Sequence, residues 1–143
     1  MRNIALFLTY LGTDYHGWQV QKNLPTVAET LEKAAAMIVK HPVHMTGCGR
    51  TDAGVHAQKM IAHFDAECDV DCRHLVDKLN RLLPADIAVQ AVRPVCSDAH
   101  ARFSATARTY HYYIVPSPES RASANLLKKL YLHRIYRLIQ IQK

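Results

Sequence analysis

The order of strand-like and helix-like apolar patterns constrains the fold of this 143-residue chain more than any other feature. Runs of apolar residues bounded by turn signals indicate strands, and apolar residues at a spacing of three and four indicate helices. The first helix follows a Thr-x-x-Glu capping box at Thr26 and Glu29. The predicted elements are strand 4–11, helix 26–40, strand 43–46, strand 60–64, helix 75–83 and strand 87–91.

This order predicts an α+β fold of the ferredoxin-like, split βαβ type, with an antiparallel sheet and both helices on one face. A further strand is expected over 106–115. Alternation along it would place Arg108, Tyr110 and Tyr112 on one face. That face suits a charged substrate with stacking bases, although aromatic residues are also common in ordinary strands.

The stretch GCGRTDAGVHA shows neither strand alternation nor a helical period, so it is predicted to be a loop. Asp52 within it is either a turn aspartate or a carboxylate that acts as nucleophile or general base. Arg50, two residues away, could pair with Asp52 or hold a phosphate. A plain turn needs one glycine, whereas this loop has Gly47, Gly49 and Gly54, which permit close backbone approach to a ligand. The pattern favours a functional loop.

A second unusual loop, DYHGW, contains the only tryptophan, Trp18, which we interpret first as a core residue.

Composition and residue spacing limit the classes of protein to which this chain can belong. No apolar run reaches the length of a membrane span, and the four cysteines are irregularly spaced, as in an intracellular chain with free thiols. Cys68, Cys72 and His74 lack the paired spacing of a metal site. The net charge of +6 arises entirely from residues 121–143, which hold six Lys and Arg and no acid. The hint of nucleic-acid binding that this charge gives therefore belongs to the tail.

Four blocks, in order, resemble the TruA family of tRNA pseudouridine synthases. They are GTDYHGWQVQ with PTVAETLEKA, then GRTDAGVHA, then LPADIAV, then ARFSATARTYHYYI. The aspartate block is highly specific, and the others support it. The resemblance covers residues 4–115 and implies the pseudouridine synthase fold.

The resemblance implies an isomerase that converts uridine to pseudouridine at positions 38–40 of the tRNA anticodon stem-loop, with no metal or organic cofactor. It places the catalytic aspartate at Asp52, in a dry pocket where a guanidinium would keep it ionised. Arg50 would help to extrude the target base, and Tyr110 would stack on the flipped uracil, with Arg108 on the same face. The implied partner is tRNA, the implied assembly is a homodimer, and the implied location is cytoplasmic, without a membrane.

The resemblance ends at about Val115. The family consists of two similar halves with the active site between them, and the second half brings a basic residue to the aspartate. We therefore expect residues 1–115 to be an N-terminal half, truncated before the second half, and 116–143 to be a divergent basic tail with helical spacing. Three alternatives remain open for such a chain: an inactive fragment, a half-enzyme completed by a second chain, and an RNA-binding module without catalysis.

Overall fold

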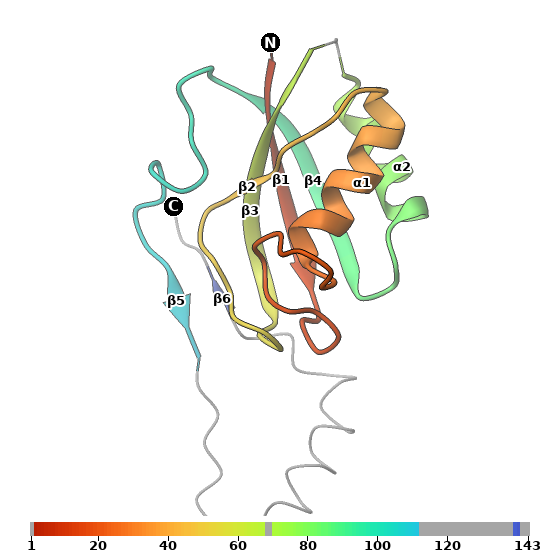
Figure 1. The fold of residues 1–143 in the computed structure, drawn as a ribbon. Coiled ribbons are helices and arrows are strands. Elements are labelled where there is room, and N and C mark those ends of the chain that lie inside the picture. The colour runs from red at the N-terminus through yellow and green to blue at the C-terminus, as the bar shows by residue number, and fades with distance from the viewer. Residues whose placement is uncertain (1, 68–69, 112–138, 141–143) are drawn as a thin grey trace, which may run out of the picture.

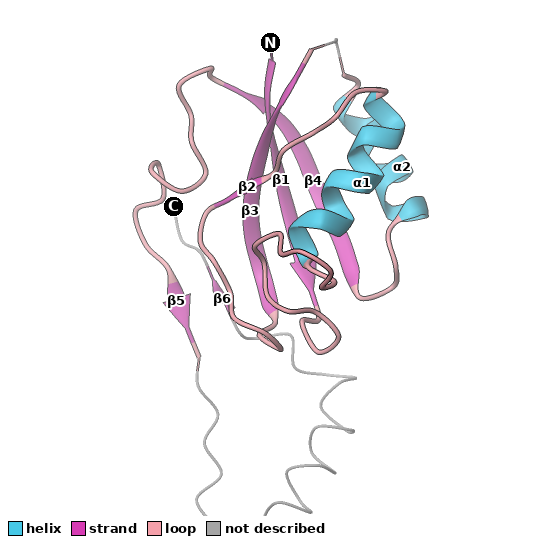
Figure 2. Cartoon of the chain, viewed as in Figure 1, coloured by secondary structure: helices cyan, strands magenta, loops and turns pink. Residues whose placement is uncertain are grey.

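The computed structural model describes residues 2–67, 70–111 and 139–140 (Figure 1). It has the predicted α+β order of strands and helices, followed by two very short strands (Figure 2). The elements are β1 (Arg2–Tyr10), α1 (Val27–Val39), β2 (Thr46–Gly47), β3 (Ala57–Ala66), α2 (Cys72–Leu82), β4 (Ile87–Val95), β5 (Thr109–Tyr110) and β6 (Ile139–Gln140).

The sheet has the antiparallel topology expected of a split βαβ fold. β1 lies between β4 and β3 and is antiparallel to both, while β2 pairs with β3. In register, Leu6 stands opposite Ala62 on β3 and Val92 on β4. Both helices cover the same face of this sheet, and the other face carries no helix among the described residues (Figure 1). The predicted fold class is therefore confirmed.

The helix boundaries follow from local chemistry. Thr26 caps α1, because its hydroxyl accepts a hydrogen bond from the backbone N–H of Glu29 at 3.4 Å. The helix ends at Lys40, which takes a left-handed conformation with φ of 65°. Asp71 caps α2 by accepting from the N–H groups of Arg73 and His74. The capping box read from the sequence thus marks the start of the first helix correctly.

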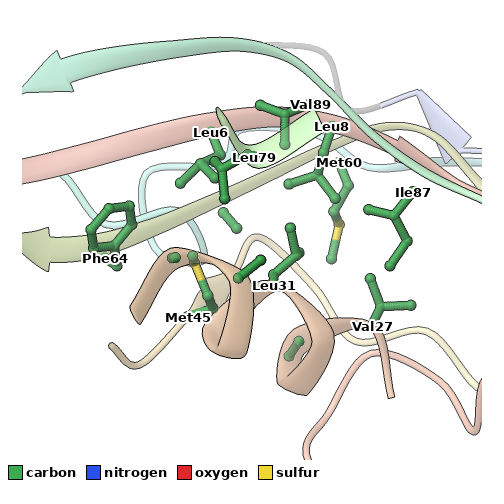
Figure 3. Packing of buried hydrophobic residues seen from close by; sticks show 14 of the residues in the cluster. Leu6, Leu8, Val27, Leu31, Met45, Met60, Phe64, Leu79, Ile87 and Val89 are labelled. Carbon is green, nitrogen blue, oxygen red and sulfur yellow. The ribbon is translucent and has the colours of Figure 1, made fainter. Parts of the chain in front are cut away.

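The core lies between the sheet and the two helices (Figure 3). Alternation along β3 buries Met60, Ala62 and Phe64, and Leu31 of α1 and Leu79 of α2 pack from the helix side. The intervening residues of β3 are less buried and belong to the helix-free face. β3 therefore directs one set of side chains into the core and the other toward the helix-free face.

Several predicted boundaries were wrong. β3 begins at Ala57, directly after the glycine loop, and β4 continues through Pro94 to Val95. Proline is tolerated there because β4 is the edge strand, where no neighbour needs the missing N–H. Residues 106–108 of the predicted strand 106–115 are irregular, and the Arg108 side chain bonds to the Cys48 and Arg102 carbonyls. Only β5 forms a strand here, and residues 112–115 lie outside the described part.

The predicted tail helix falls mostly outside the described residues. The two described residues of the tail form β6, which contradicts a helix at that point. β6 is parallel to β3 at Lys59 and antiparallel to β5 at Thr109 and Tyr110. Backbone pairing with β3 and β5 replaces helical hydrogen bonds there.

Candidate functional site

The predicted pair Arg50 and Asp52 lines one cavity of about 260 Å³. The cavity lies where the loop after β1 meets the loop before β3, and both side chains are exposed. The lining residues are His16, Gln19, Gln21, Arg50, Thr51, Asp52 and Ala53. The structure therefore combines a carboxylate, a guanidinium, an imidazole and two amides, which can together offer charge and directed hydrogen bonds to a polar ligand.

Hydrogen bonds at Thr51 fix the backbone next to Asp52. The Thr51 hydroxyl bonds to the Tyr10 hydroxyl at 2.9 Å, and its carbonyl accepts from the Trp18 N–H at 3.0 Å. Tyr10 is almost fully buried, and this burial raises the pKa of its hydroxyl. The Tyr10 hydroxyl thus stays neutral and holds Thr51 at the end of β1 by a hydrogen bond.

The other side of the loop is tied down as well. The Gly54 N–H donates to the Tyr15 carbonyl at 3.1 Å, and the Gly12 N–H donates to Nδ1 of His56 at 2.9 Å. The Tyr15 hydroxyl in turn donates to Asp86 at 2.8 Å. The Asp52 loop, residues 48–56 between β2 and β3, is therefore held on both sides by residues 10–18.

The close approach of the two loops requires glycine. A Cβ atom at Gly12 would stand 2.0 Å from the Val55 carbonyl oxygen. At Gly17, where φ is 85°, it would stand 2.3 Å from the Thr51 carbonyl oxygen. Neither space accepts a side chain without movement of one loop.

Trp18 is a packing residue, as the sequence predicted. It is buried, and its ring fills the space in which a Cβ of Gly47 would stand, 2.6 Å from its Cε2 atom. Its ring centroid lies 6.2 Å from that of Tyr10. Trp18 therefore supports the Asp52 loop from inside the protein.

Arg108 and Tyr110 lie beside the Asp52 loop at Gly49, not in the lining of the cavity. A Cβ at Gly49 would stand 3.4 Å from Nε of Arg108 and 4.0 Å from the Tyr110 hydroxyl. Nε of Arg108 donates to the Cys48 carbonyl at 2.6 Å, and one terminal nitrogen donates to the Arg102 carbonyl at 2.8 Å. Arg108 thus connects the Asp52 loop to the 100–104 turn.

The side chain of Asp52 is exposed to solvent, whereas a dry pocket was expected around it. In the described part of the chain it forms no ion pair with Arg50. The pKa of the nearby Cys48 thiol is raised by burial, which keeps it uncharged. A water-excluding site at Asp52 would need a bound ligand or further protein over the cavity.

Among the residues with assigned positions, no group of three or more His, Cys, Asp and Glu could hold a metal ion. Cys48 and Cys96 form no disulfide within the described part of the chain, and Cys68 lies outside it. No helix in the described ranges has the length and apolarity to cross a bilayer.

Three residues that line the cavity were not predicted from the sequence: His16, Gln19 and Gln21. Gln21 is oriented by a 2.8 Å hydrogen bond from its side-chain amide to the His16 carbonyl. Their polar side chains carry no periodic signal. The nearest signal was the pair Gly12 and Gly17, because two glycines within six residues indicate a close backbone approach.

Known proteins share sequence similarity with the region that forms this cavity. A family model described as tRNA pseudouridine synthase matches residues 7–104. The protein called tRNA pseudouridine synthase A of Porphyromonas gingivalis is 47% identical over 130 residues, which cover 90% of this chain and 52% of that protein. Those of Bacteroides thetaiotaomicron and Bacteroides fragilis are 55% and 48% identical, over 80% and 96% of this chain and 42% and 53% of their own lengths.

The chain thus spans about half the length of the curated relatives that it matches. The alignments that cover 90% and 96% of the chain include more than residues 1–115, so the similarity extends into the tail. Because the family model covers more than half of the chain, and its match includes both loops of the cavity, the chain belongs to the tRNA pseudouridine synthase family.

Proposed function

We propose that this chain forms the base-isomerising site of a tRNA pseudouridine synthase, with Asp52 as its catalytic carboxylate. The observation that carries the proposal is the presence of Asp52 and Arg50 in one cavity, on a loop fixed from both sides by the segment after β1. A carboxylate must be held in a defined position to attack a ribose carbon or to remove a ribose proton. Either step is compatible with this arrangement.

Arg50 would act on the RNA before chemistry. Its guanidinium is exposed at the cavity and takes part in no ion pair of the described residues, so it is available for a phosphate or for the space left by an extruded base. A base within a stem must leave the helix before its glycosidic bond can be reached. Arg50 would therefore assist extrusion while Asp52 meets the ribose.

Tyr110 and Arg108 would bind the substrate from the neighbouring side of the loop. Tyr110 is 49% exposed and lies against Gly49, where its ring could stack on a flipped uracil. The Arg108 guanidinium donates to two backbone carbonyls, so it would order this side of the loop and attract the RNA backbone. The proposed RNA sites are positions 38–40 of the anticodon stem-loop.

The exposure of Asp52 supports a site that is completed by further structure. We propose that residues 1–115 act as one half of the catalytic unit, and that a homodimer or additional polypeptide closes the cavity. An isolated chain that binds RNA without isomerising it is the competing outcome, since an open carboxylate is poorly shielded from water.

The test measures pseudouridine in an unmodified tRNA transcript incubated with the 143-residue chain. Asp52→Asn removes the charge at nearly constant size, and Asp77→Asn is the matched control, because Asp77 is exposed on α2. We expect product with the wild type and with Asp77→Asn, and none with Asp52→Asn. Equal product with Asp52→Asn would refute the role of Asp52. RNA binding without product from a folded wild-type chain would support the binding module instead.

A further inference from the structure

The most exposed large apolar side chain in the described part of the protein is Phe103, at 78%. It lies in the 100–104 turn, outside the cavity at Asp52. Single exposed apolar residues are common, so exposure alone indicates nothing. Two further features of this turn, its rigidity and its charge, distinguish Phe103 from other exposed residues such as Met37.

The turn holds the Phe103 ring in one place. The ring stacks on that of His100, with centroids 4.3 Å apart. Nδ1 of His100 accepts hydrogen bonds from the backbone N–H groups of Arg102 and Phe103, at 3.2 and 3.3 Å. The His100 N–H donates to the Ser104 hydroxyl at 3.1 Å, and the Ser104 N–H returns to the His100 carbonyl at 2.8 Å. An exposed aromatic ring is therefore preorganised before any ligand arrives.

The aromatic stack is anchored to the helix-free face of the sheet. The His100 ring meets His63 of β3 edge-on, with centroids 4.7 Å apart. Nδ1 of His63 accepts from the Ala101 N–H at 3.1 Å. His63 alternates with Ala62 and Phe64, which face the core, so it points to the opposite face. Three rings thus lead from the sheet to solvent, and Phe103 is the outermost.

The charge near the ring is positive. The Arg102 guanidinium carbon lies 6.0 Å from the centre of the Phe103 ring. Arg108 donates to the Arg102 carbonyl and is the second guanidinium at the turn. Neither arginine forms an ion pair with a carboxylate of the described residues. An aromatic ring beside uncompensated guanidinium groups is the pattern that stacks a base and attracts its phosphate.

The turn is also linked to the candidate site. Arg108 connects the Arg102 carbonyl to the Cys48 carbonyl, directly before Gly49, where Tyr110 lies. Arg108 thus joins the 100–104 turn to the loop beside Tyr110.

We propose that Phe103, supported by His100 and flanked by Arg102, is a second stacking site that takes one unpaired base of the RNA, apart from the base processed at Asp52. The proposal rests on the proposed function, because that function makes RNA the ligand. The site would hold a base next to the reacting one by its π face and its phosphate, without reading the identity of the base. It would thereby orient the RNA strand across the helix-free face.

The test is a binding measurement on the whole 143-residue chain. The probe is an anticodon stem-loop RNA with 2-aminopurine at one unpaired position at a time, whose fluorescence falls on stacking. The variants are Phe103→Ala, Phe103→Leu and Phe103→Trp, and Met37→Ala is the control, since Met37 is 55% exposed on α1. We expect quenching at one loop position with the wild type. The Ala and Leu variants should lose that quenching and bind about 5- to 150-fold more weakly, as for loss of one base stack. Trp and the control should bind as the wild type does.

The other outcomes overturn the proposal. Equal RNA affinity for Phe103→Ala and the wild type would do so, as would a wild-type chain that does not bind the RNA. A change in oligomeric state without a change in RNA affinity would assign the ring to a protein interface instead. The proposed function is tested separately, by the pseudouridine assay with Asp52→Asn. The stacking test measures RNA binding alone and does not depend on product formation, so the two failures can be told apart.

Discussion

Gly17→Ala should destabilise the protein far more than Gly54→Ala, although both glycines have a positive φ, 85° and 79°. The left-handed backbone costs an alanine about 1–2 kcal/mol at either position. At Gly54 a Cβ meets nothing within 4 Å, so the backbone strain is the whole expected loss. At Gly17 the Cβ would stand 2.3 Å from the Thr51 carbonyl oxygen, and one loop must move.

That movement adds a second loss at Gly17. Overpacking costs about 1–3 kcal/mol, and the hydrogen bond from the Trp18 N–H to the same Thr51 carbonyl is strained with it. We therefore expect Gly17→Ala to lower the free energy of unfolding by about 2–5 kcal/mol. Urea denaturation followed by circular dichroism measures both variants. Equal losses for the two would show that the loops are not packed as described, and would refute the reasoning.

Three further changes test other parts of the structure. Tyr10→Phe should lower the free energy of unfolding by about 1 kcal/mol, because it removes the hydrogen bond to Thr51, and a double-mutant cycle with Thr51→Val should show coupling. Stability should fall as pH drops below about 6.5, because burial first and His100 second lower the pKa of His63, so the unfolded chain binds a proton more readily. His63→Asn should reduce this dependence, measured by urea denaturation at several pH values. Asp71→Ala should cost about 1 kcal/mol through loss of the α2 cap, measured by thermal unfolding, and an unchanged midpoint would contradict the capping role.

The pH prediction follows from the sign of the shift. A histidine with a lowered folded pKa is neutral in the native state at a pH where the unfolded chain still takes up a proton. The stability from its neutral form is complete above 6.5 and declines as pH falls toward the folded pKa. The effect should be small, since His63 is only partly buried. Asparagine at this position can still accept from the Ala101 N–H but cannot titrate.

The sequence predicted those features that depend on periodic burial or local capping. Alternation along β3 and the apolar stripe of α1 predicted the sheet and helix, because burial on one face imposes a period. The glycines around Asp52 predicted an unusual loop, and Arg50 does line the same cavity. These signals lie within a few residues of the feature that they predict.

The features that could not be predicted depend on contacts between distant segments. The bonds that fix Thr51 come from Tyr10 and Trp18, and one of them uses only backbone atoms, which leave no pattern in a sequence. Residues 106–108 of the expected strand are irregular, and there the Arg108 side chain contacts carbonyls of two distant segments, which no local pattern signals. The 100–104 turn was missed for the same reason, since its ring stack joins residues from β3 and from the turn.

The cavity is nevertheless a direct consequence of strand register. Tyr10, the last residue of β1, pairs with Ala57, the first residue of β3, so the loop after β1 and the loop before β3 leave the sheet at the same place. His16 and Asp52 are therefore brought together by antiparallel pairing, although 36 residues separate them along the chain. A slip of one residue would turn Met60 and Phe64 out of the core and also separate the two loops. The apolar alternation that stabilises the fold thus holds the candidate site in register.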